Sequence, residues 1–299
     1  MNTTLNRRTF LATAAAAATA LPAIAASPIK RQAGTRMRLA LNAYSFNKPL
    51  MDGTMTLFDV IEFCAKNRVD SLDATGYYFP GYPKVPPDEY LYKLKRAGFV
   101  NGVMISGTGV RNDFSVADAT ARKNDIQLVK DWIDAARKMG APVVRVFSGK
   151  SVPEGSTFDK VLDYMIPAFK ECTDYGRSRG VIVGLQNHHD FLKSADETIR
   201  VLEAVGSEWF GSILDIGSLH QGDPYAEIEK LVPYAVSWQI KESVYFNNGK
   251  ATPVDLHQVR MAIERVGYRG PLPFEALGPG DPTARIVQFL GQIRKEFSL

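Results

Sequence analysis

Cysteine is scarce in this sequence. Cys64 and Cys172 are the only two cysteines in 299 residues, so the chain has neither a disulfide framework nor a Cys-x-x-Cys metal motif. We expect both thiols to be buried as small apolar side chains. Long apolar runs are also lacking, because the alanine-rich residues 11–26 are fewer than the ~20 that span a bilayer as a helix. A stable membrane anchor is therefore not expected.

Neither sign of charge dominates. The sequence has 36 lysine and arginine residues against 32 aspartate and glutamate residues, a formal charge of +4, and only four histidines. This near-neutral balance lacks the basic excess of DNA- and RNA-binding proteins, so no nucleic-acid partner is expected. Hydrophobic residues make up 45% of the chain, which excludes a disordered protein and is typical of a globular enzyme.

Residues 1–25 have the order of an export signal. Arg7 and Arg8 precede an alanine-rich apolar stretch that ends in Ala23-Ile24-Ala25, with no acidic residue among the 25. The arginine pair followed by Thr-Phe-Leu resembles a twin-arginine signal, which implies the twin-arginine export machinery as a partner and a periplasmic or secreted protein. We expect cleavage after Ala25 and a flexible lead-in over residues 26–37. The alternative is an amphipathic or disordered N-terminus on a cytosolic enzyme.

The rest of the chain alternates short apolar runs with segments of helical periodicity. The expected strands are residues 38–46, 71–76, 101–107, 143–148, 181–187, 211–217, 235–241 and 271–276. Eight strand–helix repeats without a linker predict an α/β fold, a single (β/α)8 TIM barrel over residues 38–299. The competing arrangement, an open doubly wound sheet, lacks its G-x-G-x-x-G motif after the first strand.

Glycines follow most of the expected helices. Gly98, Gly140, Gly180, Gly206 and Gly267 each precede an expected strand, where a left-handed residue would end the helix.

Polar residues interrupt the apolar strands near their C-terminal ends, where barrel enzymes carry their chemistry. A buried polar or charged group there needs a partner or a ligand to offset its lost hydration. These residues are Asn42, Tyr44, Asp73, Thr75, Arg145, Gln186, His188, Asp215, Gln239, Lys241 and Glu275. Any one of them could have a purely structural role, but as a group they predict a functional site.

Four segments together resemble the xylose-isomerase-like TIM barrel family, which includes sugar epimerases. The segments are Gly-Leu-Gln-Asn-His at 184–188, Leu-Asp-Ile-Gly-Ser at 214–218, Trp-Gln-Ile-Lys-Glu at 238–242 and Pro-Phe-Glu at 273–275. The resemblance covers nearly the whole chain after the leader. It implies a TIM barrel with one divalent metal, held by a glutamate, an aspartate, a histidine and a glutamate. The positions here are Gln186, Asp215, Gln239 and Glu275.

Two of these four residues depart from the family pattern. Gln186 replaces a glutamate and Gln239 a histidine, so a metal would meet oxygen ligands only, which favours Mn²⁺ or Mg²⁺ over Zn²⁺. His188 could act as a replacement ligand or as a proton carrier. His188 and His189 could equally well only donate hydrogen bonds to loop carbonyls.

The same departures affect the reaction that the resemblance implies. Family epimerases use two glutamates as a paired acid and base, and Gln186 cannot take a proton. Glu275 remains as a base and Lys241 as a group that polarises a carbonyl, although Lys241 could be only an ion-pair partner of Glu275 or Asp215. We therefore expect an isomerase that abstracts a proton next to a carbonyl of an unphosphorylated sugar or keto-sugar. The alternatives are a keto-glycoside lyase or hydrolase, and a metal-free carbohydrate-binding barrel without catalysis.

A small-molecule carbohydrate is the expected ligand. Aromatic side chains after the second expected strand, over residues 77–82, suit the C–H face of a sugar ring, although a packed loop would have the same composition. The expected substrate-binding residues are Tyr44, Asp73, Arg145, Trp238 and His189. The sequence leaves an oligomer possible.

Overall fold

Eight parallel strands close into a barrel, in the order β1-β10-β7-β6-β5-β4-β3-β2. This computed structural model describes residues 27–34 and 36–299. The strands are β1 (Arg38–Asn42), β2 (Ser71–Thr75), β3 (Met104–Gly109), β4 (Val143–Val146), β5 (Ile182–Gln186), β6 (Phe210–Asp215), β7 (Ala235–Lys241) and β10 (Pro271–Glu275). Each overlaps one of the predicted strands, which confirms the single (β/α)8 barrel.

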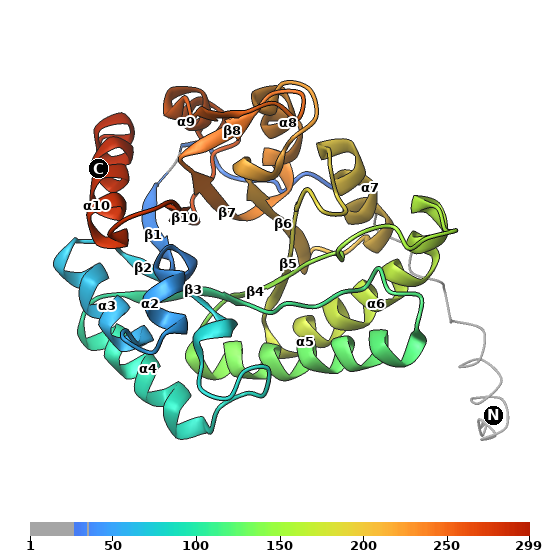
Figure 1. The fold of residues 1–299 in the computed structure, drawn as a ribbon, viewed down its shortest axis with the longest axis horizontal. Helices are drawn as coiled ribbons and strands as arrows, with labels where there is room; N and C mark the ends of the chain where they lie inside the picture. Colours follow the sequence, from blue (N-terminus) through green and yellow to red (C-terminus); the bar gives the residue numbers. More distant parts are fainter. Residues whose placement is uncertain (1–26, 35) are drawn as a thin grey trace, which may run out of the picture.

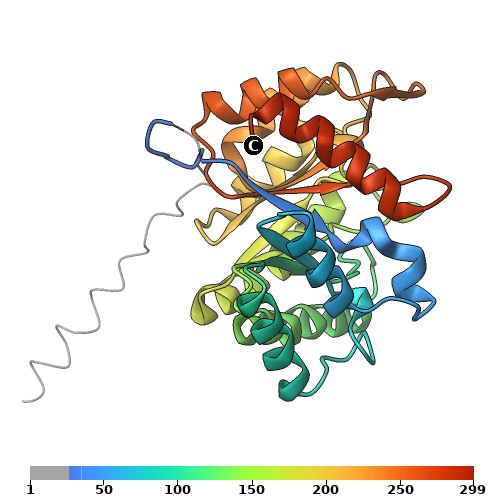
Figure 2. The same ribbon diagram turned by 90° about the vertical axis from the view of Figure 1, so that its left-hand side faces the viewer.

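Helices surround the barrel (Figures 1 and 2). They are α2 (Asn47–Met51), α3 (Leu57–Lys66), α4 (Asp88–Val100), α5 (Ala119–Met139), α6 (Phe158–Arg179), α7 (Ala195–Val205), α8 (Pro224–Leu231), α9 (Leu256–Arg265) and α10 (Pro282–Phe297). Their apolar faces pack on the strands, and the buried thiols of Cys64 and Cys172 belong to this core, as predicted. None of the helices in the described residues is long and apolar enough to span a membrane.

The helix ends follow local signals in the sequence. Gly140, Gly180 and Gly206 adopt left-handed conformations at the C-termini of α5, α6 and α7, as predicted. Gly267 also has a positive φ and follows Val266, the C-cap residue of α9. The prediction for Gly98 is wrong, because Gly98 lies inside α4, where a Cβ atom would come within 2.5 Å of the Val103 carbonyl oxygen. Its small size is needed for packing and not for a turn.

Strand register brings the polar residues to one end of the barrel. Lys241 of β7 is level with Glu275 of β10, and Asp215 of β6 is level with Gln239 of β7. Because parallel strands all end at the same face, these side chains converge at the C-terminal mouth.

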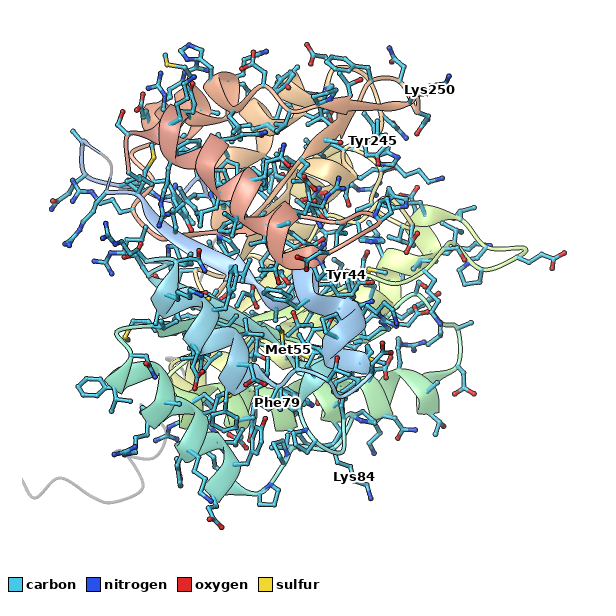
Figure 3. The ribbon with its side chains drawn as sticks, turned by 60° about the vertical axis from the view of Figure 1, so that its left-hand side comes forward. Tyr44, Met55, Phe79, Lys84, Tyr245 and Lys250 are labelled. Atoms are coloured by element: carbon cyan, nitrogen blue, oxygen red, sulfur yellow. The ribbon has the colours of Figure 1, made fainter. Side chains whose placement is uncertain are left out.

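A short hairpin beyond β7 is absent from the sequence prediction. Its strands are β8 (Ser243–Tyr245) and β9 (Ala251–Pro253), which pair antiparallel. Tyr245 contributes to the wall of the barrel mouth, whereas Lys250 projects from the hairpin turn (Figure 3).

The segment before β1 contacts the opposite end of the barrel. The amide of Ile29 donates to the Pro233 carbonyl at 2.9 Å, and Arg269 donates to the Gly34 carbonyl at 3.0 Å. These contacts anchor the segment that we expected to be a flexible lead-in. The predicted export signal, residues 1–25, lies outside the described residues.

Candidate active site

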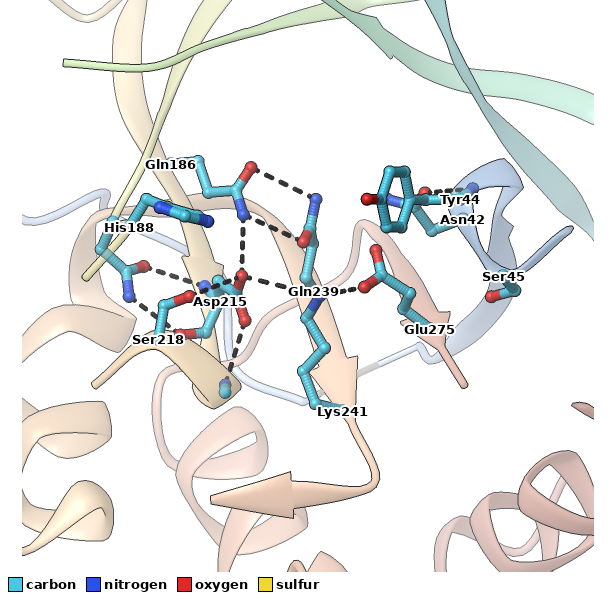
Figure 4. A network of polar contacts seen from close by, with 12 residues as sticks. Asn42, Tyr44, Ser45, Gln186, His188, Asp215, Ser218, Gln239, Lys241 and Glu275 are labelled. Atoms are coloured by element: carbon cyan, nitrogen blue, oxygen red, sulfur yellow. Dashed lines mark hydrogen bonds and ion pairs between the residues drawn. The ribbon is translucent and has the colours of Figure 1, made fainter. Parts of the chain in front are cut away.

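A cavity of about 650 Å³ opens at the C-terminal ends of the strands. Its wall includes the four side chains at the family's metal positions, Gln186, Asp215, Gln239 and Glu275, together with Lys241 (Figure 4). The four are nearly inaccessible to solvent, with exposed fractions of 1–5%. Buried polar groups of this kind require partners, so their contacts determine what the site can do.

Asp215 is the centre of a hydrogen-bond network. One carboxylate oxygen accepts from the Gln186 amide at 2.7 Å and from the Ser218 hydroxyl at 3.0 Å. The other accepts from the backbone N–H of Gly217 at 3.0 Å. The Gln186 amide also donates to the Gln239 carbonyl oxygen at 3.1 Å. Both glutamine side chains are therefore already committed to protein partners.

Lys241 forms an ion pair with Glu275 and lies 3.7 Å from Asp215. Burial raises the pKa of the Glu275 carboxyl, although the ammonium of Lys241 opposes that shift. Burial alone would lower the pKa of Lys241, but the carboxylates of Asp215 and Glu275 together raise it. Lys241 is thus held as a cation beside a glutamate whose proton affinity is higher than usual.

Gly217 makes room for the lysine. A Cβ atom at this position would lie 2.7 Å from Cγ of Lys241, so a larger residue would displace the aliphatic part of that side chain. The ion-pair role that the sequence left open for Lys241 is present in the structure. It does not compete with a role toward a ligand, because Lys241 also lines the cavity.

The four family positions do not suit a divalent ion. The Lys241 ammonium already occupies the space between Asp215 and Glu275, and both glutamine amides are engaged with one another and with Asp215. A second, doubly charged cation would be repelled by the ammonium and would meet only two anionic ligands. The predicted convergence of the four residues is correct, whereas their expected role as a Mn²⁺ or Mg²⁺ site finds no support in this arrangement.

Histidines gather at the rim of the cavity. His188 Nδ1 lies 2.9 Å from Asp190, and the rings of His188, His189 and His220 stack with centroids 4.6 and 4.5 Å apart. Burial lowers the pKa of His188, which favours the neutral imidazole and leaves it able to accept a proton. His188, His189 and Asp190 also bring possible metal-ligating atoms within 4.8 Å of one another.

Three of the five predicted substrate-binding residues line the cavity: Tyr44, Arg145 and His189. The structure contradicts the prediction for Trp238. Its side chain is fully buried outside the barrel and packs edge-on against Tyr268, because residue 238 points away from the interior that Gln239 faces. Asp73 is also absent from the cavity wall, since its carboxyl is buried within the barrel.

The aromatic residues of the loop after β2 have two different roles: one lines the cavity, as expected for a sugar contact, and another packs in the core. Tyr77 lines the cavity, whereas Phe79 is buried against Trp132. Sequence reasoning missed several wall residues that lie beyond the ends of the barrel strands: Arg111, Asn112, Lys150 and His220 in loops, and Tyr245 in β8. Arg111 and Lys150 follow β3 and β4 closely, so their position after a strand was an available signal.

Comparison with known proteins agrees with this architecture. Residues 58–293 match the family model described as xylose isomerase-like TIM barrel. No curated protein matches the sequence. Among solved structures, the D-psicose 3-epimerase with D-tagatose from Clostridium cellulolyticum H10 is 15% identical, with a TM-score of 0.71 over 87% of this chain and 99% of that chain.

Two further structures have similar values. An L-ribulose 3-epimerase is 15% identical, with a TM-score of 0.72 over 88% of this chain and 95% of that one. The IOLI protein with a binding zinc atom is 14% identical, with a TM-score of 0.72 over 88% of this chain and 100% of that one. At these identities, the likeness establishes a shared fold.

Proposed function

The chain belongs to the xylose isomerase-like TIM barrel family, and on this basis we propose that it is a sugar isomerase- or epimerase-like enzyme that moves a proton at a carbon next to a carbonyl. The observation that carries the proposal is the buried Lys241–Glu275 pair at the base of the cavity. Neutral sugar epimerases among the fold neighbours support a carbohydrate substrate. We propose an unphosphorylated sugar or keto-sugar.

In the proposed reaction, Glu275 accepts a proton from the carbon next to the carbonyl. The electron pair of that C–H bond moves toward the carbonyl oxygen, and the ammonium of Lys241 stabilises the developing negative charge. The raised pKa of Glu275 favours this transfer, because a more basic carboxylate is a stronger proton acceptor. The positive charge comes from Lys241, so the step requires no metal ion.

The intermediate has two possible outcomes. Glu275 can return the proton to the former carbonyl carbon while the hydroxyl on the deprotonated carbon passes its proton to the former carbonyl oxygen, which exchanges the positions of carbonyl and hydroxyl. Alternatively, the enolate re-forms the carbonyl and makes a C=C bond, and a leaving group on the β carbon departs with the electrons of its own bond to that carbon. Gln186 lacks the acid needed for a symmetric two-base inversion at one carbon. This substitution supports an isomerase or a keto-glycoside lyase over a 3-epimerase of the neighbours' kind. His188 lines the same cavity, and burial lowers its pKa, so its protonated form is a stronger acid than an ordinary imidazolium and can protonate a leaving group.

Solvent deuterium tests the assignment of the base. The enzyme is incubated in deuterated buffer with a panel of keto-sugars and glycosides, and deuterium in substrate and product is measured by NMR. Glu275→Gln should abolish incorporation while ligand binding largely survives, since an amide cannot accept the proton. Glu171→Gln, which changes an exposed glutamate on α6, is the matched control and should leave incorporation unchanged.

Continued incorporation by the Glu275→Gln enzyme would reject Glu275 as the base and make His188 the leading candidate. Sugar binding without turnover or exchange on any panel member, with or without added Mn²⁺, would instead support a carbohydrate-binding barrel without catalysis. We also propose, from the leader alone, that the protein acts in the periplasm or outside the cell.

A further inference from the structure

Every carboxylate on the cavity wall lies beside a nitrogen-bearing side chain, which is a cation for all of them except Asp190. Glu275 and Asp215 share Lys241, Glu242 pairs with Arg285 at 2.7 Å, and Asp190 faces His188 at 2.9 Å. The wall also carries three cations that form no ion pair with any carboxylate that the structure describes, although Asp73 and Glu275 attract Arg145, and Asp125 attracts Lys150, at longer range. Among the described residues, no carboxylate oxygen lies within 4.0 Å of the basic groups of Arg111, Arg145 and Lys150, which we call the basic wall.

Arg145 is the buried member of the basic wall. Only 6% of it is exposed, and its guanidinium donates to the Val110 carbonyl at 3.0 Å and to the Tyr77 hydroxyl at 2.7 Å, which are both neutral. Its central carbon, Cζ, lies 4.1 Å from the Phe147 ring centroid. The carboxyl of Asp73 also attracts Arg145 electrostatically without forming an ion pair with it, and burial raises the pKa of that carboxyl to about 6. A buried guanidinium with mainly neutral partners is costly unless a ligand completes its neutralisation.

A glycine leaves space for the Arg145 side chain. Gly109, at the end of β3, would place a Cβ atom 2.7 Å from Nε of Arg145. Any larger residue at position 109 would clash with the Arg145 side chain and displace it from this position. The absence of a side chain here therefore keeps Arg145 on the wall.

Arg111 places a second guanidinium beside the Tyr77 ring. Its central carbon lies 4.5 Å from the Tyr77 ring centroid, and that of Arg145 lies 5.4 Å from the same centroid. Two like charges around one aromatic ring repel each other, and an anion between or beside them relieves that repulsion. Lys150, on the loop after β4, adds a third positive charge to this side of the cavity.

The basic wall lies across the barrel from the proposed chemistry. In the closed strand order, β4 is four strands from β10, and β3 is four strands from β7. Arg145 therefore faces the Glu275 side of the mouth, and Arg111, which follows β3, faces the Lys241 side. A ligand spanning the cavity would present one end to the basic wall and the other to the acid–base pair.

We propose that the basic wall binds the carboxylate of an acidic sugar, such as a uronic acid or its keto derivative, and so sets the substrate class of the site. Guanidinium groups fixed against aromatic rings present planar pairs of N–H donors, which match a planar carboxylate. The assignment rests on the proposed function, since it uses the Lys241–Glu275 pair as the reacting end of the same cavity.

Calorimetry with matched sugars tests the assignment. The probes are D-glucuronate, D-galacturonate and D-mannuronate, each compared with its neutral hexose and with the corresponding hexose 6-phosphate. At least one uronate should bind the full-length protein tenfold or more tightly than its neutral counterpart. Raising the salt concentration should reduce this preference. Arg145→Gln and the exposed Arg111→Gln should each reduce it by tenfold or more, whereas Lys66→Gln, an exposed lysine at the end of α3, should not change it.

Three results would overturn the proposal: no binding of any uronate at millimolar concentration, equal binding of acids and neutral sugars, or a preference that survives in Arg111→Gln. Tighter binding of the hexose phosphates than of the uronates would replace the carboxylate with a phosphate. The outcome is separable from that of the proposed function. Deuterium exchange on neutral sugars alone would retain the proton transfer and reject the acidic substrate, whereas uronate binding without exchange would do the reverse.

Discussion

Lys241 controls the charge of the site at the scale of single residues. Its ammonium lowers the pKa of Glu275 against the larger effect of burial, which raises it. We predict that Lys241→Met slows proton exchange by roughly 10² to 10³, as expected for the loss of one oxyanion-stabilising donor. Because the main opposition to the effect of burial is then removed and only Arg145 still lowers this pKa, the acidic limb of the pH–rate profile should move to higher pH.

Deuterium exchange rates measured from pH 4 to pH 10 in both proteins test this prediction. The base must be deprotonated, so activity should rise with pH through a value above that of an ordinary glutamate. A slower Lys241→Met enzyme with an unmoved acidic limb would mean that Lys241 affects the rate without acting on Glu275.

The same lysine determines the response to metal ions. We predict that the unmodified protein shows no Mn²⁺ binding that depends on Asp215, because the Lys241 ammonium lies 3.7 Å from that carboxylate. Combining Lys241→Ala with Gln186→Glu should create Mn²⁺ affinity, since the cation is removed and a carboxylate is added at a family position. Gln186→Glu alone, with Lys241 retained, is the control and should gain less.

Calorimetric titration with Mn²⁺ measures these affinities, and adding Asp215→Asn shows whether the ion binds at this centre or at the rim histidines. One Mn²⁺ bound by the unmodified protein and lost in Asp215→Asn would restore the four-residue metal site and reject the role assigned to Lys241.

Asp73 couples stability to pH. Burial raises the pKa of its carboxyl to about 6, while that of the unfolded chain stays near the ordinary aspartate value, so the folded state binds more protons between these two values. Stability from this group is complete at low pH, is lost as pH rises toward 6, and does not return above it. The loss amounts to about 3 kcal/mol of unfolding free energy.

We predict that Asp73→Asn removes this pH-dependent component. Urea unfolding at pH 4.5 and pH 7.5 gives the change in free energy across the range for each protein. The change should be more favourable by about 1–3 kcal/mol in Asp73→Asn than in the unmodified protein. The exposed Asp163→Asn is the control. Identical pH dependence in all three proteins would place the Asp73 titration outside this range.

At the scale of elements, two helical glycines have opposite roles. Gly98 in α4 faces the Val103 carbonyl oxygen, which an added Cβ atom would approach to 2.5 Å, whereas Gly291 in α10 has no atom within 4 Å of such a position. We predict that Gly98→Ala lowers the free energy of unfolding by about 1–3 kcal/mol through overpacking. Gly291→Ala should raise it by up to about 1 kcal/mol, because alanine favours a helix.

Urea unfolding of both variants measures these changes at a common pH. The pair controls for the general effect of replacing glycine by alanine. An equal gain in stability from both substitutions would show that α4 can shift away from Val103 without cost.

Local patterns predicted most of the elements. Apolar runs of strand length marked all eight barrel strands, and terminal glycines marked the ends of α5, α6 and α7. They failed where the cause was not local. Gly98 is required by its close approach to the carbonyl of Val103, just before β3. The β8–β9 hairpin consists of three-residue strands, which are too short to show a periodic pattern.

At the scale of the whole molecule, the leader predicts the route to the compartment. Replacing both Arg7 and Arg8 with lysine should leave the precursor in the cytoplasm, because the twin-arginine receptor reads the arginine pair whereas a general secretion signal needs only positive charge. Fractionation of cells that express the two forms, followed by immunoblotting, measures the exported fraction. Normal export of the double-lysine form would exclude the twin-arginine route.

The sequence by itself determined the barrel fold and the position of its polar residues at the C-terminal ends of the strands. Strand periodicity decides which side chains face inward, and parallel strands place their C-terminal residues at one mouth, so Gln186, Asp215, Gln239 and Glu275 were expected to converge. Only the tertiary structure decided what they meet there. The position of Lys241 between two carboxylates and the gathering of Arg111 and Arg145 around Tyr77 depend on loops and side-chain rotamers from strands far apart in sequence. Charge balance is a property of distances across the barrel, and these distances are not encoded in the spacing along any one strand.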